Sequence, residues 1–189
     1  MFTKAVSFDM RNLDVSNVTD MSFMFYACGN NASVSSTFSI KGADTWDTSK
    51  VTDMTGMFTG TGTYAHHWSL GDISVWNTSA VTTMEGMFAS SGYRADRWSL
   101  DLSDWDVSFV KNMSSMFAHA GRNAGAFVLT GILNWDTQNV QNMNSMFYYT
   151  GTDVSYKLDL SGWDVGNVKS HSSFNTSAEG KVIPPIWRK

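Results

Sequence analysis

The sequence predicts an α/β solenoid, a leucine-rich-repeat-like stack of six coils in which each coil has a short parallel β-strand and a short α or 3-10 helix. One motif recurs in tandem, as WDTSKVTDMTGMF at 46–58, WNTSAVTTMEGMF at 76–88, WDVSFVKNMSSMF at 105–117 and WDTQNVQNMNSMF at 135–147. Weaker copies flank these four, at 13–25 (LDVSNVTDMSFMF) and 163–175 (WDVGNVKSHSSFN). The spacing between copies is 33, 30, 29, 30 and 28 residues, a period typical of stacked repeats.

The repeats predict a single domain over residues 1–189. Its copies are centred on 6–29, 38–62, 68–92, 98–121, 127–151 and 156–180, and a C-terminal cap follows at 181–189. One coil has too few large apolar side chains to offset the conformational entropy it loses on folding. We therefore expect neighbouring coils to share one continuous core.

The strand of each coil is predicted from alternation. In WSLDLSDW at 98–105, apolar and polar residues alternate, with Trp98, Leu100 and Leu102 on one side. This pattern is typical of a half-buried strand.

The helix of each coil is predicted from period and end signals. An apolar residue stands at every third position from Val107 to Met116, and ten of the twelve methionines occupy two such slots. Residues that can cap a helix precede the first Met slot: Asp20, Asp53, Thr83, Asn112, Asn142 and Ser170. Glycines suited to a left-handed helix end follow: Gly29, Gly62, Gly92, Gly121 and Gly151. We expect the Met and Phe side chains to pack in the core, as do the recurring tryptophans, although a sugar-stacking Trp surface is an alternative.

An acidic or amide residue follows the Trp slot in every copy: Asp14, Asp47, Asn77, Asp106, Asp136 and Asp164. Such a side chain can accept a hydrogen bond from the backbone N–H two residues later, and this forms an Asx turn. A calcium ladder is the alternative, but Asn77 lacks the charge and no second carboxylate recurs beside this position.

Composition argues against several classes of function. The formal charge of −4 gives no basic field for nucleic acid, and no apolar run is long enough for a membrane span. The single cysteine and the scattered histidines predict neither a disulfide framework nor a metal site. We find no nucleophile elbow or phosphate-binding loop, and so expect no enzyme and no cofactor. The first residues, MFTKAVSFDM, do not resemble a signal peptide.

The segments LDLSDWDVSFVKNMSSMF and LDVSNVTDMSFMF resemble the BspA-like leucine-rich-repeat surface proteins of bacteria, and the resemblance runs from about Phe8 to about Asn175. It implies a non-enzymatic protein, secreted or attached to the cell wall, that is associated with adhesion to host or matrix components. The coils are longer than the common unit of that family. The extra length lies between the glycine predicted to end the helix of each coil and the next strand.

Those inserts hold the candidate ligand-binding residues. Tyrosine, arginine and histidine gather there and just before them, a composition favoured at recognition surfaces. The candidates are Tyr64, His66, His67, Tyr93, Arg94, Arg97, Arg122, Tyr148, Tyr149 and Tyr156. The alternative is a solvated loop whose tyrosines lie on the core.

The sequence thus predicts a non-catalytic binding and adhesion module, extracellular or on the bacterial cell surface, that recognises a host or matrix protein or glycan. The alternative is a structural component of a fibre, appendage or virus particle. Pro184 and Pro185 block the C-terminal edge, whereas the N-terminal coil carries no such device. We expect that coil to be covered by a preceding domain, by self-association or by another partner.

Overall fold

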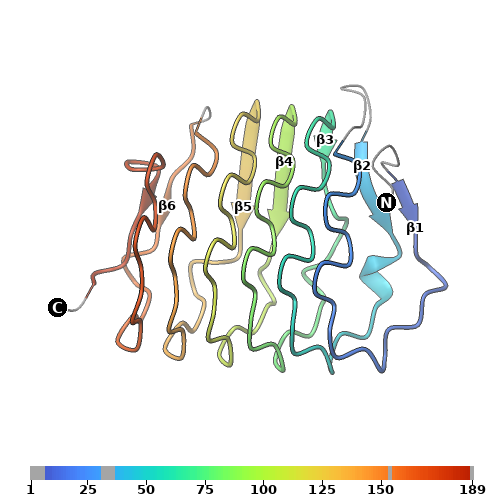
Figure 1. The fold of residues 1–189 in the computed structure, drawn as a ribbon, viewed down its shortest axis with the longest axis horizontal. Helices are drawn as coiled ribbons and strands as arrows, with labels where there is room; N and C mark the ends of the chain where they lie inside the picture. Colours follow the sequence, from blue (N-terminus) through green and yellow to red (C-terminus); the bar gives the residue numbers. More distant parts are fainter. Residues whose placement is uncertain (1–6, 31–36, 153–154, 188–189) are drawn as a thin grey trace.

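The computed structural model describes residues 7–30, 37–152 and 155–187, so residue 6 of the first predicted copy, 153–154 of one insert and 188–189 of the predicted cap lie outside the described residues. The chain forms a parallel β-solenoid with almost no helix (Figure 1). Within the described ranges, the only helical segment is the single 3-10 turn η1, Ala43–Thr45. No helix of this part of the chain combines the length and apolar character needed to cross a bilayer.

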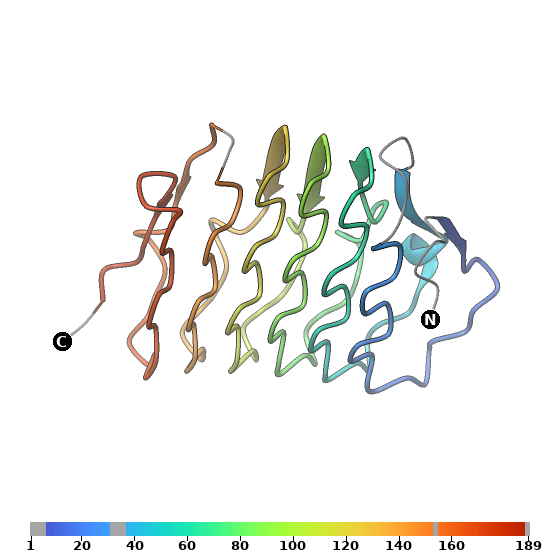
Figure 2. The same ribbon diagram turned by 45° about the horizontal axis from the view of Figure 1, so that its top comes forward.

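One face of the solenoid is a parallel sheet. Its five strands, in spatial and sequence order, are β1 (Ser7–Asp9), β2 (Thr37–Lys41), β3 (His67–Trp68), β4 (Arg97–Asp101) and β5 (Ala126–Thr130). Equivalent residues of successive coils pair, as Trp68 does with Trp98 and Trp98 with Phe127. Figure 2 shows the strands side by side along the long axis. The predicted alternation is confirmed in β4, where Trp98 and Leu100 are buried and Arg97 and Asp101 are exposed.

The regular stack of six like coils, each with a strand and a helix, is not supported. The five-stranded sheet ends at β5, and β6 (Leu158–Asp159) pairs instead with β7 (Val182–Ile183) in a separate two-stranded sheet. Where a helix was predicted in each coil, the chain forms a run of consecutive tight turns. Together we call these runs the turn ladder, and they cover residues 22–30, 55–64, 85–94, 114–123, 144–152 and 172–177.

The turn ladder differs from a helix in where its amides bond. The N–H of Met116 donates to Met113 O at 3.2 Å, and that of Ala118 donates to Ser115 O at 3.0 Å, so these bonds close local turns. The intervening amides cross to the next coil: Ser115 N–H donates to Asn144 O at 2.8 Å, and Phe117 N–H to Met146 O at 2.9 Å. A helix keeps all its backbone hydrogen bonds within one segment. In the turn ladder, alternate backbone amides instead donate to the next coil.

Left-handed residues impose this geometry. In the turn ladder, besides the glycine near the end of each of the first five runs, two positions per coil, four residues apart, have positive φ. The first is occupied by Phe23, Gly56, Gly86, Ser115, Ser145 and Ser173, and the second by Ala27, Gly60, Ser90, His119, Tyr149 and Ser177. Each reversal of handedness breaks a continuous right-handed helix.

The glycines predicted to be left-handed are so, with φ from 48° at Gly92 and Gly121 to 65° at Gly29, although each lies near the end of a run of turns and not at the end of a helix. At Gly92 a Cβ atom would lie 2.7 Å from Trp68 Cβ, so the close approach also requires glycine.

The core consists of aromatic columns filled by the Met slots, which confirms that the tryptophans and methionines are packing residues. Ring centroids of Trp46 and Trp76 lie 5.8 Å apart, and those of Phe58 and Phe88 lie 5.7 Å apart. A further column in the sheet layer stacks Trp68 on Trp98 at 5.0 Å and Trp98 on Phe127 at 4.4 Å. The Met slots of the central coils are fully buried: Met54, Met57, Met84, Met87, Met113, Met116, Met143 and Met146.

Candidate functional site

A cluster of aromatic and basic side chains lies on successive coils, around the point where the turn ladder gives way to the insert before the next strand. We call it the aromatic–basic cluster, and it consists of Tyr93, His119, Arg122, Tyr148 and Tyr149. All five side chains are half-buried. The stacking of coils brings them together from separate parts of the sequence.

Arg122 is the centre of the cluster. Its Cζ atom lies 4.1 Å from the ring centroid of Tyr149 and 5.8 Å from that of Tyr93. Both distances fall within the range of a cation–π contact. The ring of His119 stacks on Tyr149, with centroids 5.5 Å apart and planes inclined by 12°, and meets Tyr148 edge-on at 5.2 Å.

Two members of the cluster adopt strained backbone conformations. His119 has φ of 59° and Tyr149 has φ of 55°, both in the left-handed region. The equivalent position in the other coils is occupied by small residues, namely Ala27, Gly60, Ser90 and Ser177. A left-handed non-glycine residue costs about 1 kcal/mol. The left-handed backbone is common to all the coils, but only these two place large aromatic side chains at this position.

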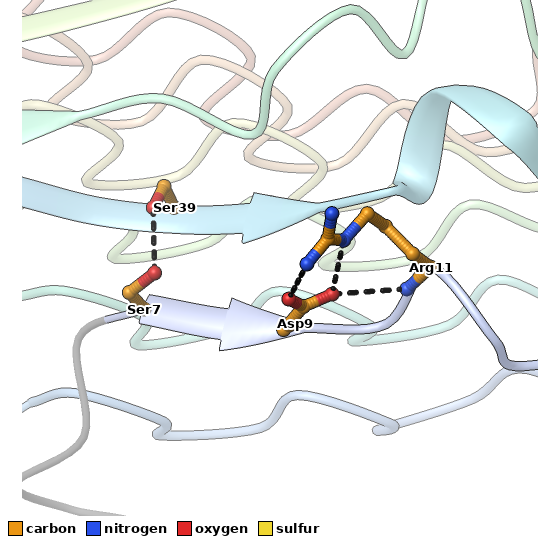
Figure 3. A network of polar contacts seen from close by, with 4 residues as sticks. All are labelled: Ser7, Asp9, Arg11 and Ser39. Atoms are coloured by element: carbon orange, nitrogen blue, oxygen red, sulfur yellow. Dashed lines mark hydrogen bonds and ion pairs between the residues drawn. The ribbon is translucent and has the colours of Figure 1, made fainter.

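The charge of Arg122 is not neutralised by any described carboxylate. The only ion pairs among the described residues are Arg11 with Asp9 and His66 with Asp96. The Arg11–Asp9 pair, shown in Figure 3, gives the contrasting case: Arg11 Nε donates to Asp9 Oδ1 at 2.9 Å, and this holds the pKa of Asp9 down at about 2. At the cluster, burial and the neighbouring Arg122 charge lower the pKa of His119 below its usual value.

The family model described as "Mycoplasma protein of unknown function, DUF285" matches residues 1–36, 30–126 and 94–180. The chain belongs to this family. Three overlapping matches within one DUF285 chain agree with its tandem repeats. Among curated proteins and among solved structures, no match was found.

The other predicted residues lie mostly on the N-terminal side of the aromatic–basic cluster. Arg94 Cζ lies 5.6 Å from the ring of Tyr64 in the preceding coil. His66 Nδ1 lies 2.5 Å from Asp96 Oδ2, and its ring is 4.1 Å from that of His67. Arg97 is exposed on β4 and pairs in register with His67 and Ala126.

Tyr156 lies elsewhere, in the sheet layer of the DUF285 core. Its ring packs against Phe127 with centroids 4.7 Å apart, and its hydroxyl donates to Thr150 O at 3.0 Å. Burial raises its pKa above the usual value. Tyr156 thus extends the column of Trp68, Trp98 and Phe127 and does not join the surface cluster.

The prediction from sequence omitted His119, although its ring contacts both Tyr148 and Tyr149 in the cluster. The signal that identifies it is positional. His119 stands four residues after Ser115, at the second left-handed position of the turn ladder, where a large side chain is unusual.

The Asx turns predicted after each Trp slot are confirmed. The N–H of Ser49 donates to Asp47 Oδ1 at 3.0 Å, and that of Ser108 to Asp106 Oδ1 at 2.9 Å. Asn77 forms the same turn through its amide oxygen, which lies 3.1 Å from the N–H of Ser79. In the described ranges, no three His, Cys, Asp or Glu side chains are grouped so that they could hold a metal ion.

Proposed function

We propose that this chain is a non-catalytic binding and adhesion module of a bacterial surface or secreted protein, and that it recognises a host or matrix protein or glycan. Membership of a repeat family supports the repeat character of the module. The resemblance to BspA-like leucine-rich-repeat surface proteins supports the cell-surface location and the adhesive role.

The observation that carries the proposal is the aromatic–basic cluster. Tyrosine and arginine are, with tryptophan, the side chains enriched in binding hot spots. Here Arg122 is held between Tyr93 and Tyr149 without a described acidic partner. His119 and Tyr149 place aromatic rings at a position where the other coils have small residues, and ligand binding gives a reason for keeping both rings at the surface.

A glycan and matrix-protein binding array tests this function. We expect the wild-type chain to bind at least one component and Tyr93→Ala to weaken that binding at least tenfold, because the substitution removes one ring beside Arg122. Arg97→Ala, on the exposed side of β4, tests whether the predicted surface extends beyond the cluster, and we expect a smaller loss. Absence of binding to every component, with the chain folded, would contradict an adhesive role.

A second function, assembly through the N-terminal coil into a fibre, appendage or particle, has its own observation. In the turn ladder each coil donates alternate N–H groups to the coil that follows it, so the first coil presents carbonyl groups on its outer side. Among the described residues, the carbonyls of Ser22, Met24 and Tyr26 accept no hydrogen bond. Leu13 and Met24 are 42% and 38% exposed, whereas the equivalent Trp76 and Met57 are 1% and 0% exposed.

The opposite end is closed differently. Trp187 stacks on His171 with centroids 4.0 Å apart and packs edge-on against Phe174 at 5.1 Å. If the first coil mediates assembly, sedimentation velocity should show concentration-dependent oligomers, and Met24→Lys should abolish them because it places a charge on that surface. A monomer at all concentrations, with β1 protected from hydrogen exchange, would contradict assembly through this end.

A further inference from the structure

We infer that the aromatic–basic cluster binds the carboxylate group of an acidic carbohydrate, with Arg122 as the anion-binding residue. This inference rests on the proposed binding function and adds the chemical class of the ligand. Three observations support it: the geometry of Arg122, the half-exposed rings beside it and the hydrogen bonding of the surrounding backbone.

The position of the guanidinium leaves its hydrogen-bonding edge available. Arg122 Cζ lies over the ring of Tyr149 at 4.1 Å, a separation short enough for the guanidinium to stack through its face. The N–H donors of a guanidinium lie in its plane and match the two oxygens of a carboxylate. The only side-chain polar contact of Arg122 in the described structure is a long one, 3.4 Å from Nη1 to His119 Nδ1.

Further positive charge lies near the cluster. Lys181 Nζ donates to the carbonyl oxygens of Gly151 and Thr152, and Thr152 Oγ1 donates in turn to Arg122 O at 2.9 Å. Arg94 directly follows Tyr93 in the chain and is exposed. Asp96, which follows Tyr93 by three residues, is already paired with His66. Among the described residues named here, the charged groups that have no acidic partner are therefore basic, on a chain whose net charge is −4.

The backbone around the cluster favours a carbohydrate over an extended peptide. A peptide that adds to a sheet needs unpaired N–H and C=O groups along an edge. Here the amides are paired between coils: His119 N–H donates to Tyr148 O at 2.7 Å, Gly121 N–H to Ser91 O at 2.9 Å, and Asn123 N–H to Tyr93 O at 2.8 Å. The groups available on this surface are instead half-exposed aromatic rings beside the guanidinium of Arg122. Aromatic rings can pack against the C–H groups of a sugar, and the guanidinium can bind the carboxylate of the sugar through two N–H donors.

Isothermal titration with matched pairs of sugars tests the inference. Penta-galacturonate is compared with its fully methyl-esterified form, and sialyllactose with lactose, so that only the acidic group differs within each pair. Poly-glutamate supplies carboxylates without sugar. The variants are Arg122→Gln, which removes the charge, and Arg122→Lys, which keeps the charge but loses the planar fork. Arg11→Gln is the control, because Arg11 is exposed and already paired with Asp9 at the N-terminal end of the sheet.

We expect at least one acidic sugar to bind at least tenfold more tightly than its neutral partner. Arg122→Gln should weaken that binding at least tenfold and Arg122→Lys at least threefold, with Arg11→Gln unchanged and all three variants melting like the wild-type chain. The inference is overturned if neither acidic sugar binds, if the neutral partner binds equally well, if Arg122→Gln binds as the wild type does, or if poly-glutamate binds as tightly with the same dependence on Arg122. If an array finds a ligand that has no acidic group, the binding function stands and only the ligand class fails.

Discussion

Replacing Trp98 by alanine is expected to lower the free energy of unfolding by about 3–5 kcal/mol, because the substitution leaves a large cavity in a closely packed core. Trp98 is fully buried and stacks between Trp68 and Phe127 at 5.0 and 4.4 Å. Its indole N–H donates to Ser91 Oγ at 3.0 Å, so the substitution also leaves a buried hydroxyl without this partner. Urea unfolding followed by circular dichroism measures the change.

The control for Trp98→Ala is Phe109→Ala. Phe109 is 62% exposed, and its removal should change the free energy of unfolding by less than about 0.5 kcal/mol. Similar losses in the two variants would contradict a core built on the Trp68, Trp98 and Phe127 column.

Gly131→Ala is expected to lower the free energy of unfolding by about 3 kcal/mol, from a left-handed alanine together with overpacking against the neighbouring coil. Gly131 has φ of 86°, and a Cβ atom there would lie 2.5 Å from Leu102 C in the preceding coil, so the backbone of one coil must move. Gly180→Ala separates this clash from the conformational cost, because Gly180 has φ of 80° but nothing within 4 Å of the added Cβ. We expect Gly180→Ala to cost about 1 kcal/mol, the cost of a left-handed alanine alone.

The same urea titrations measure both glycine variants. If Gly131→Ala and Gly180→Ala lower the free energy of unfolding by equal amounts, the close approach of Gly131 to the neighbouring coil is not present in solution.

Much of the fold could be predicted from the sequence because the repeat constrains it. Alternation around Trp98 predicts the strand, and the polar residue after each Trp predicts the Asx turn; both are local patterns, and both are confirmed. The predicted helix was wrong because an apolar residue at every third position fits a run of tight turns as well as a short helix. A sign of the difference was present: Gly56 and Gly60 stand four residues apart within one predicted helix, where glycine is unfavourable.

The aromatic–basic cluster could be predicted only in part. The composition of the inserts identified Tyr93 and Arg122, but which side chains meet depends on how each coil is placed over the next. His119 was omitted because its coil has Ser115 at the first left-handed position, so no glycine marks the pattern there. Tyr156 was assigned to the surface because the stacked column of Phe127 and its neighbours follows from strand register, which local sequence does not reveal.

Hydrogen exchange resolved by NMR along the turn ladder tests the stacked architecture most directly. The N–H groups of Gly56, Phe58 and Gly60 bond to the next coil, whereas those of Met57 and Thr59 close turns within their own coil. We predict that both sets are protected and exchange together in one cooperative opening, because the coils share a core. Protection of Met57 and Thr59 alone, with Gly56, Phe58 and Gly60 exchanging like an unfolded chain, would show that the coils do not stack.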